Sequence, residues 1–190
     1  MRVTAAPGIP FSDDDRPRAP SRPATVLSRA GREAQQVLRG IHDHLRREMR
    51  QVVGAVESAG TDARRAVDAR ALVNDLTMGV NYAALGSFCG RYCSVVDLHH
   101  RIEDAAMFPD LAAADADLLP VLQRLSAEHV AIHGALVELD AALVDMLTTE
   151  ADALPRVQAA VTVLSDGLLD HLDYEERELL PALGRLELLV

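Results

Sequence analysis

The seven histidines of this 190-residue chain fall into four short groups, and three of these groups have the spacing of one helical turn. The one-turn pairs are His99 with Glu103, His129 with His133, and His171 with Glu175, and the fourth group is His42 with His44. Side chains four residues apart on an α-helix lie above one another on the same face. Each pair can therefore present two metal ligands in one direction, which favours a fold in which several helices face a common interior.

The composition agrees with helices packed on helices. Hydrophobic residues make up 49% of the chain but aromatic residues only 3%, and the apolar side chains are mainly Ala, Leu and Val, which suit helices better than sheets. The net charge of −10 argues against a nucleic-acid partner. No apolar run approaches the roughly 20 residues of a membrane span, and the N-terminus lacks the apolar stretch of a secretory signal. We therefore expect no membrane partner and a cytoplasmic protein.

Apolar periodicity divides the chain into an arm and one helical domain. Residues 1–27 are rich in Pro, and we expect them to form a disordered or loosely docked arm. Residues 28–190 are expected to form an all-α, up-down-up-down four-helix bundle. The first helix is predicted from about residue 28 to Gly60, the third from about 117 to 147, and the fourth from about 153 to 186, with Pro181 kinking or ending its regular part.

The segment 61–108 is too long for a single helix of this bundle, because it would extend ~70 Å. For His99 to lie at the same depth as His44, the second helix must begin near residues 80–85, where Gly79 and Asn81 provide a break. Residues 62–78 are then expected to form an extra helical segment between the first and second helices.

Matching depths on four successive helices indicate a metal site. A lone histidine on a helix is more often a surface or core residue than a ligand, but chance does not explain three one-turn pairs and a fourth group at compatible depths. The candidate ligands are His44, His99, Glu103, His129, His133, His171 and Glu175. Imidazoles and carboxylates without a thiolate suit iron, with manganese and zinc as alternatives, and seven ligands are enough for two ions.

Several side chains near these ligands have more than one interpretation. His42 and His44 point about 200° apart on a helix, so only one can face the interior. His44 is preferred because it continues the apolar stripe of Ile41 and Leu45, which makes His42 solvent-facing. His100 is rotated ~100° from His99 and is a candidate for a supporting role around the ligands.

Two tyrosines and two cysteines complete this set. Tyr92 is either a core residue or part of a pocket wall, and the role of Tyr174 stays open. Cys89 and Cys93 are interpreted as core thiols rather than a redox pair.

The ligand order, with the flanking sequences His99-His100-Arg-Ile-Glu103-Asp104, Phe108-Pro109 and Leu180-Pro181, resembles the hemerythrin-like, or HHE cation-binding, family, and among its members the actinobacterial type. The resemblance implies a four-helix bundle around two iron ions joined by an oxo or hydroxo bridge. It implies one iron held by His129, His133 and His171, the other held by His44 and His99, and bridges from Glu103 and Glu175. Glu175 departs from the family pattern, because oxygen-carrying relatives commonly place Asp one residue later.

The resemblance also implies the function classes. The first is a non-haem di-iron protein that binds, senses or reacts with O2, NO or peroxide. The alternatives are an oxidoreductase, which decomposes peroxide or oxidises a reduced cofactor with O2, and a protein that stores or senses iron. No GxGxxG fingerprint is present, so electrons would come from an external donor. The sequence leaves open whether the protein is an enzyme, its reductant and its oligomeric state.

Overall fold

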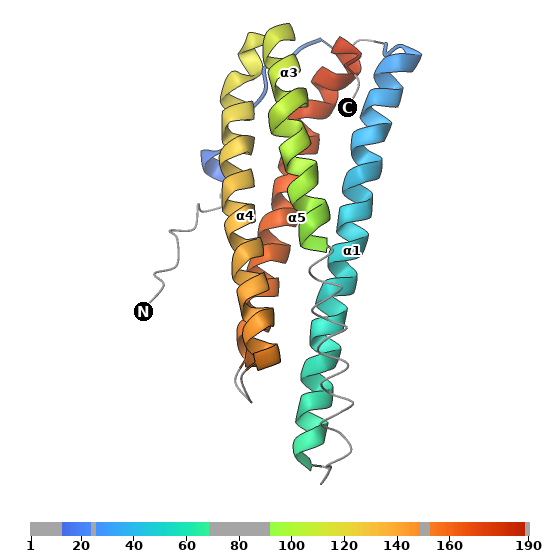
Figure 1. Ribbon diagram of the computed structural model, residues 1–190. Coiled ribbons are helices and arrows are strands. Elements are labelled where there is room, and N and C mark those ends of the chain that lie inside the picture. Colours follow the sequence, from blue (N-terminus) through green and yellow to red (C-terminus); the bar gives the residue numbers. More distant parts are fainter. Residues whose placement is uncertain (1–12, 24–25, 69–91, 149–152, 189–190) are drawn as a thin grey trace.

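The computed structural model describes residues 13–23, 26–68, 92–148 and 153–188, and side chains within 13–23, 26–58, 92–145 and 154–188 (Figure 1). The described chain is helical, with no strand in these ranges. Its long helices are α1 (Arg29–Asp68), α4 (Leu119–Thr148) and α5 (Ala153–Leu186). The fourth rod consists of a helical segment at 92–102, a π-helical turn, η2 (Glu103–Met107), and the short helix α3 (Phe108–Ala114), and it is joined to α4 by the 3-10 turn η3 (Ala116–Leu118).

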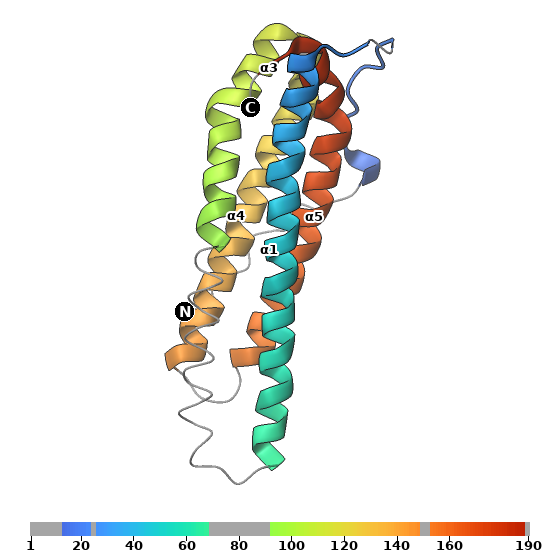
Figure 2. The same cartoon turned by 90° about the vertical axis from the view of Figure 1, so that its right-hand side faces the viewer.

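The four rods lie side by side as a bundle. Figures 1 and 2 show α5 running alongside both α1 and α4, with the rod that ends in α3 closing the remaining side. The expected all-α bundle is confirmed. Among the described helices, none has both the length and the apolar character needed to cross a membrane.

Helix α1 is longer than its sequence suggests. It passes through Gly60 and ends at Asp68, so the predicted stop at Gly60 is wrong. A single Gly inside a helix costs only ~1 kcal/mol relative to Ala, which the rest of a 40-residue helix can outweigh. Residues 62–68, expected to belong to a separate segment, therefore continue α1. The rest of that segment and the expected break near 80–85 lie outside the described residues.

The other helix ends agree closely with the sequence pattern. Helix α4 begins at Leu119, directly before Pro120, and α5 runs from Ala153 to Leu186. Pro181 does not end α5, which continues for five more residues. The carbonyl of Leu180, directly before this proline, accepts a 2.6 Å hydrogen bond from Nε2 of Gln35 on α1.

Two apolar clusters fill the bundle, one above the other along its axis. On α1 one cluster ends at Leu38 and the other begins at Leu45, and on α4 they are separated between Leu125 and Ile132. The same division occurs on the other two rods. At one level of the bundle, between the two apolar clusters, all four rods therefore carry buried polar side chains. We call this level the polar layer.

The N-terminal segment 13–23 lies against the bundle. Arg16 is buried, and the backbone of Ala19 donates a 2.7 Å hydrogen bond to Glu178 of α5. The described part of the predicted disordered or loosely docked arm is therefore fixed by specific contacts. Arg16 and Arg18 pair with carboxylates of α4 and α5, a long-range pairing that the Pro-rich composition of the segment does not reveal.

Candidate metal centre

The polar layer consists of five histidines and two glutamates that are all buried. They are His42 of α1, His99, His100 and Glu103 of the 92–107 segment, His129 of α4, and His171 and Glu175 of α5. Their donor atoms form two groups, and within each group one atom from every residue lies within 4.8 Å of the others. The first group is His100, His129 and His171, and the second is His42, His99, Glu103 and Glu175.

Each glutamate lies between a histidine of one group and a histidine of the other. Oε1 of Glu103 is 3.2 Å from Nε2 of His99, and its Oε2 is 3.5 Å from Nε2 of His129. In the same way, Oε2 of Glu175 is 3.5 Å from Nε2 of His42 and 3.7 Å from Nε2 of His171. This is the placement that two carboxylates need in order to bridge two metal ions.

Many polar atoms at the middle of this layer have no hydrogen-bond partner among the described residues. They are Nε2 of His42, His99, His100, His129 and His171, and both carboxylate oxygens of Glu103 and Glu175. A buried polar atom without a partner costs about 1–3 kcal/mol, and more when it is charged. So many unpaired lone pairs aimed at one place fit bound cations, because an ion would satisfy all of them.

A second set of carboxylates lies beside the Nδ1 atoms of three of the rings, on the side away from Glu103 and Glu175. Nδ1 of His42 is 3.0 Å from Oε1 of Glu176, and Nδ1 of His171 is 3.0 Å from Oε2 of Glu128. Nδ1 of His129 lies 3.1 Å from Oδ2 of Asp104. An ionised carboxylate can only accept, so a neutral ring beside it carries its proton on Nδ1 and leaves Nε2 free. Carboxylate–histidine pairs of this kind orient metal-binding imidazoles.

Burial favours the neutral form of His99 and His171, and hydrogen bonds favour the charged form of Glu128 behind them. Burial, with a smaller effect from the neighbouring rings, lowers the pKa of His99 to about 3, and burial likewise lowers the pKa of His171. Burial also raises the pKa of Glu103 well above its usual range, and the adjacent Glu175 adds to this. Glu128 differs: burial opposes ionisation there, but hydrogen bonds from His171 and two arginines hold its pKa to about 2.

The structure places His42, and not His44, in the polar layer. His42 is fully buried, whereas His44 is exposed, so the sequence-based preference for His44 is wrong about which ring faces the interior. Leu38, His42, Leu45 and Met49 follow one another at spacings of four, three and four residues, which is one face of a helix. The sequence contains this spacing. A stripe that includes Ile41, which is only half-buried, points to His44 instead.

His133 is also outside the layer. Its side chain is 61% exposed and its Nδ1 is 3.0 Å from Oδ1 of Asp97. His100, expected in a supporting role, lies inside and stacks on His129 with 4.1 Å between ring centroids. The other predicted ligands, His99, Glu103, His129, His171 and Glu175, are brought together as expected.

The π-helical turn explains how Glu103, Met107 and Phe108 all lie in the interior. In this turn the backbone N–H of Phe108 donates to the carbonyl of Glu103, five residues earlier. Pro109 follows directly and has no N–H to continue the regular pattern. The wider turn keeps Glu103, Met107 and Phe108 all buried. Regular α-helical spacing does not predict this turn, and π turns occur often at functional sites.

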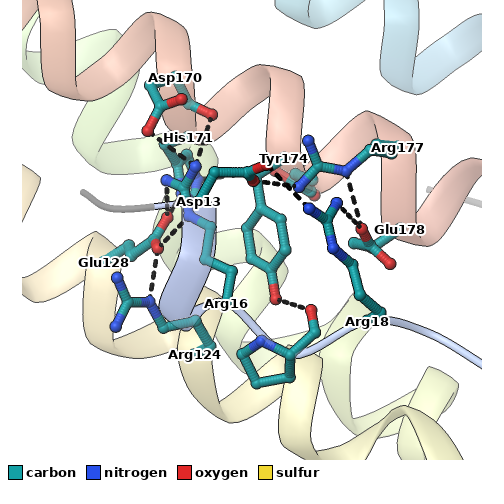
Figure 3. Close-up of polar contacts among 12 residues, drawn as sticks. Asp13, Arg16, Arg18, Arg124, Glu128, Asp170, His171, Tyr174, Arg177 and Glu178 are labelled. Atoms are coloured by element: carbon teal, nitrogen blue, oxygen red, sulfur yellow. Dashed lines mark hydrogen bonds and ion pairs between the residues drawn. The ribbon is translucent and has the colours of Figure 1, made fainter.

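Sequence reasoning also missed the network behind His171 (Figure 3). Glu128 has a fully buried side chain, and its carboxylate accepts from Arg16 at 2.8 and 2.9 Å and from Arg124 at 2.6 Å. Tyr174 donates to the carbonyl of Pro17 at 2.8 Å and lies beneath the Arg16 guanidinium, 4.6 Å from the ring centroid. The sequence gives one sign of this network, because Glu128 directly precedes the candidate ligand His129 on a helix.

Tyr92 and Cys93 belong to the apolar core and not to the polar layer. Tyr92 is buried in the apolar core and donates to the carbonyl of Leu45 at 3.2 Å. Cys93 packs half-buried against the same core, and burial raises the pKa of its thiol to about 11. Cys89 lies outside the described residues.

Comparison with known proteins adds one match. The family model of the hemerythrin HHE cation binding domain matches residues 33–183, which include all seven residues of the polar layer. No curated protein and no solved structure matches the chain.

Proposed function

Because this chain belongs to the hemerythrin HHE cation-binding family, we propose that its polar layer holds two iron ions and that this centre binds or reacts with O2, NO or peroxide. The family and the histidine–glutamate cluster support cation binding directly. The identity of the metal, the number of ions and the small-molecule chemistry are the proposal.

The position of the two glutamates carries the proposal of a pair of ions. Glu103 and Glu175 each face one histidine from either group, at 3.2–3.7 Å. In the proposed arrangement His100, His129 and His171 hold one ion, His42 and His99 hold the other, and the glutamates bridge. This assignment replaces His133 by His100 and His44 by His42, and it keeps five imidazoles and two carboxylates.

The donor set favours iron. Imidazole and carboxylate ligands without a thiolate suit iron and manganese, and zinc as well. Zinc is commonly four-coordinate, whereas seven side chains shared between two ions fit five- or six-coordinate metals. When bound, two iron ions would supply exchangeable coordination positions and one-electron redox steps for a diatomic molecule or peroxide.

The protein's own contribution is to orient the rings and to exclude water. Carboxylates on Nδ1 of His42 and His171 fix these rings with Nε2 toward the centre. Apolar clusters close the bundle on both sides of the layer, and Phe108 stacks on His129 at 5.4 Å between ring centroids. A dry pocket of this kind limits access to small molecules. Any electrons would come from an external donor, a role that we propose for a partner protein or cofactor.

Metal analysis followed by optical spectroscopy tests the proposal. We expect two iron ions per chain after anaerobic loading and a spectral change when the ferrous protein meets O2. A stable species that reverses on removal of O2 supports a carrier or sensor. Rapid oxidation, with gas evolution from added peroxide, supports an oxidoreductase. A chain that takes up no iron, or only one ion, contradicts the two-ion proposal.

A further inference from the structure

One side chain from outside the matched family domain reaches the polar layer. Arg16 belongs to the N-terminal segment 13–23, before the residues 33–183 that match the family model. Its side chain is only 1% exposed, which is rare for arginine and requires that its charge be paired. The family domain alone does not account for this buried guanidinium.

The guanidinium of Arg16 holds both oxygens of Glu128. Its Nε donates to Oε1 at 2.8 Å, and its Nη2 donates to Oε2 at 2.9 Å, a two-point geometry specific to arginine and carboxylate. Its Nη1 lies 2.7 Å from Oδ2 of Asp170 on α5. Arg16 therefore ties α4 to α5 directly behind His171, as Figure 3 shows.

The oxygen of Glu128 that Arg16 holds through Nη2 is the one that faces His171. Nδ1 of His171 is 3.0 Å from Oε2 of Glu128, the same atom. Arg124 donates to the other oxygen, Oε1, at 2.6 Å. Without Arg16 the carboxylate could rotate about its bond to Arg124, and the ring of His171 would lose its fixed direction.

Further contacts keep the segment in place. The phenol of Tyr174 donates to the carbonyl of Pro17, the backbone of Ala19 donates to Glu178, and Arg22 pairs with Asp115 and Asp117 at 3.1 and 2.7 Å. We propose that residues 13–22 act as a clasp on the bundle, and that Arg16 is a positioning residue that orients His171 for metal through Glu128. This inference deepens the proposed metal site and rests on it.

A matched pair of full-length variants tests the clasp. Arg16→Met removes the guanidinium, while Arg29→Met makes the same change outside the clasp, at an exposed side chain that pairs with Glu33. Co²⁺ titration, followed by visible absorption, serves as the metal probe. We expect Arg16→Met to weaken Co²⁺ binding by about 10–100-fold and to change the absorption bands, and Arg29→Met to match the wild type.

A measurement without metal separates this inference from the proposed function. In the metal-free, ¹⁵N-labelled wild type we expect a protected Nδ1–H signal from His171, assigned by its loss in His171→Gln. We expect that signal to weaken or exchange faster in Arg16→Met. A wild type that binds no Co²⁺ or iron overturns the metal site, whereas the Nδ1–H signal still tests the clasp.

An unchanged metal site and an unchanged Nδ1–H signal in the variant overturn the clasp. If folded Arg16→Met keeps the wild-type Co²⁺ affinity, absorption bands and Nδ1–H signal, Arg16 does not position His171. If circular dichroism shows that Arg16→Met does not fold, Arg16→Lys decides. Lysine keeps the charge but cannot contact both oxygens of Glu128 and Asp170 at once, so we expect weaker Co²⁺ binding. Unchanged binding and an unchanged signal in Arg16→Lys overturn the inference.

Discussion

His42 and His44 form a natural matched pair, because they stand on the same helix two residues apart and point to opposite sides. His42 is buried between Glu175 and Glu176, and His44 is exposed. We expect His42→Ala to lose at least one of two iron ions per chain, because it removes a ring from the group with fewer histidines. His44→Ala should retain both. Iron content per folded chain checks the prediction, and loss of iron from His44→Ala with retention in His42→Ala would reverse the assignment.

At the residue scale, the sequence is sufficient to locate the polar layer but not every side chain in it. Glu103 and Glu175 could be placed because each lies one turn after a histidine, and that rule depends only on helix geometry. Glu128 could not be placed, because its partner Arg16 is 112 residues away and their pairing depends on how the N-terminal segment docks. Local spacing contains no information on such a contact.

The π-helical turn Glu103–Met107 is the element that sets the register of the second rod. Deleting the exposed Ala105 would remove the extra residue of the turn and restore ordinary α-helical bonding. Glu103 and Phe108 would then be four residues apart, ~40° from each other on the same face of an α-helix, so both would stay inside. We therefore expect the deletion to keep both the helical content and two iron ions per chain.

The control for that deletion keeps the number of residues. Ala105→Ser leaves the π turn in place and should retain wild-type iron content. Iron analysis and circular dichroism on both variants decide the matter. Fewer than two ions per chain in the folded deletion variant would show that the wide turn itself is required for the site.

The crossing of α1 and α5 gives a prediction on stability. A Cβ built on Gly31 would lie 2.0 Å from the backbone oxygen of Gly184, whereas a Cβ on Gly40 would meet nothing within 4 Å. We expect Gly31→Ala to destabilise the fold by about 1–3 kcal/mol, because backbone cannot move aside cheaply. Gly40→Ala should stabilise it by about 0.5–1 kcal/mol, because Gly weakens an exposed helix interior.

Thermal unfolding distinguishes these two changes. For a chain of this size 1 kcal/mol corresponds to ~2–4 °C in Tm. Opposite signs are the expected result, and equal Tm values for the two variants would contradict the close approach of α1 and α5 at Gly31.

At the element scale, periodicity predicts where the long rods lie, and it fails where their continuation depends on packing or on a special turn. Helix α1 continues beyond Gly60 although glycine is a common stop signal. The π turn could not be derived either, because the only local sign of it is a proline that many helices also carry near an end. The π turn goes with the burial of Glu103, Met107 and Phe108, which depends on the neighbouring rods.

For the whole molecule, the polar layer makes stability depend on metal. The layer places two buried carboxyl groups between two apolar clusters, and without a cation their buried oxygens lack partners among the described residues. We expect chelation to lower Tm. At a free metal concentration 1,000-fold above Kd, linkage predicts about 4 kcal/mol of stabilisation, or ~8–16 °C. Scanning calorimetry with and without metal checks this, and an unchanged Tm would indicate that no cation is bound at the layer.

Glu103→Gln separates the benefit of the metal from the cost of the carboxylates. Glutamine has nearly the same shape but no charge, so the metal-free variant no longer buries two carboxylates with atoms within 4.8 Å of each other. We expect its metal-free Tm to rise above that of the metal-free wild type, while the increase on adding metal shrinks. The two shifts have opposite signs, so general damage to the fold cannot imitate them. If metal raises Tm equally in wild type and Glu103→Gln, Glu103 is not a bridging ligand, and the pair of ions must be held in another way.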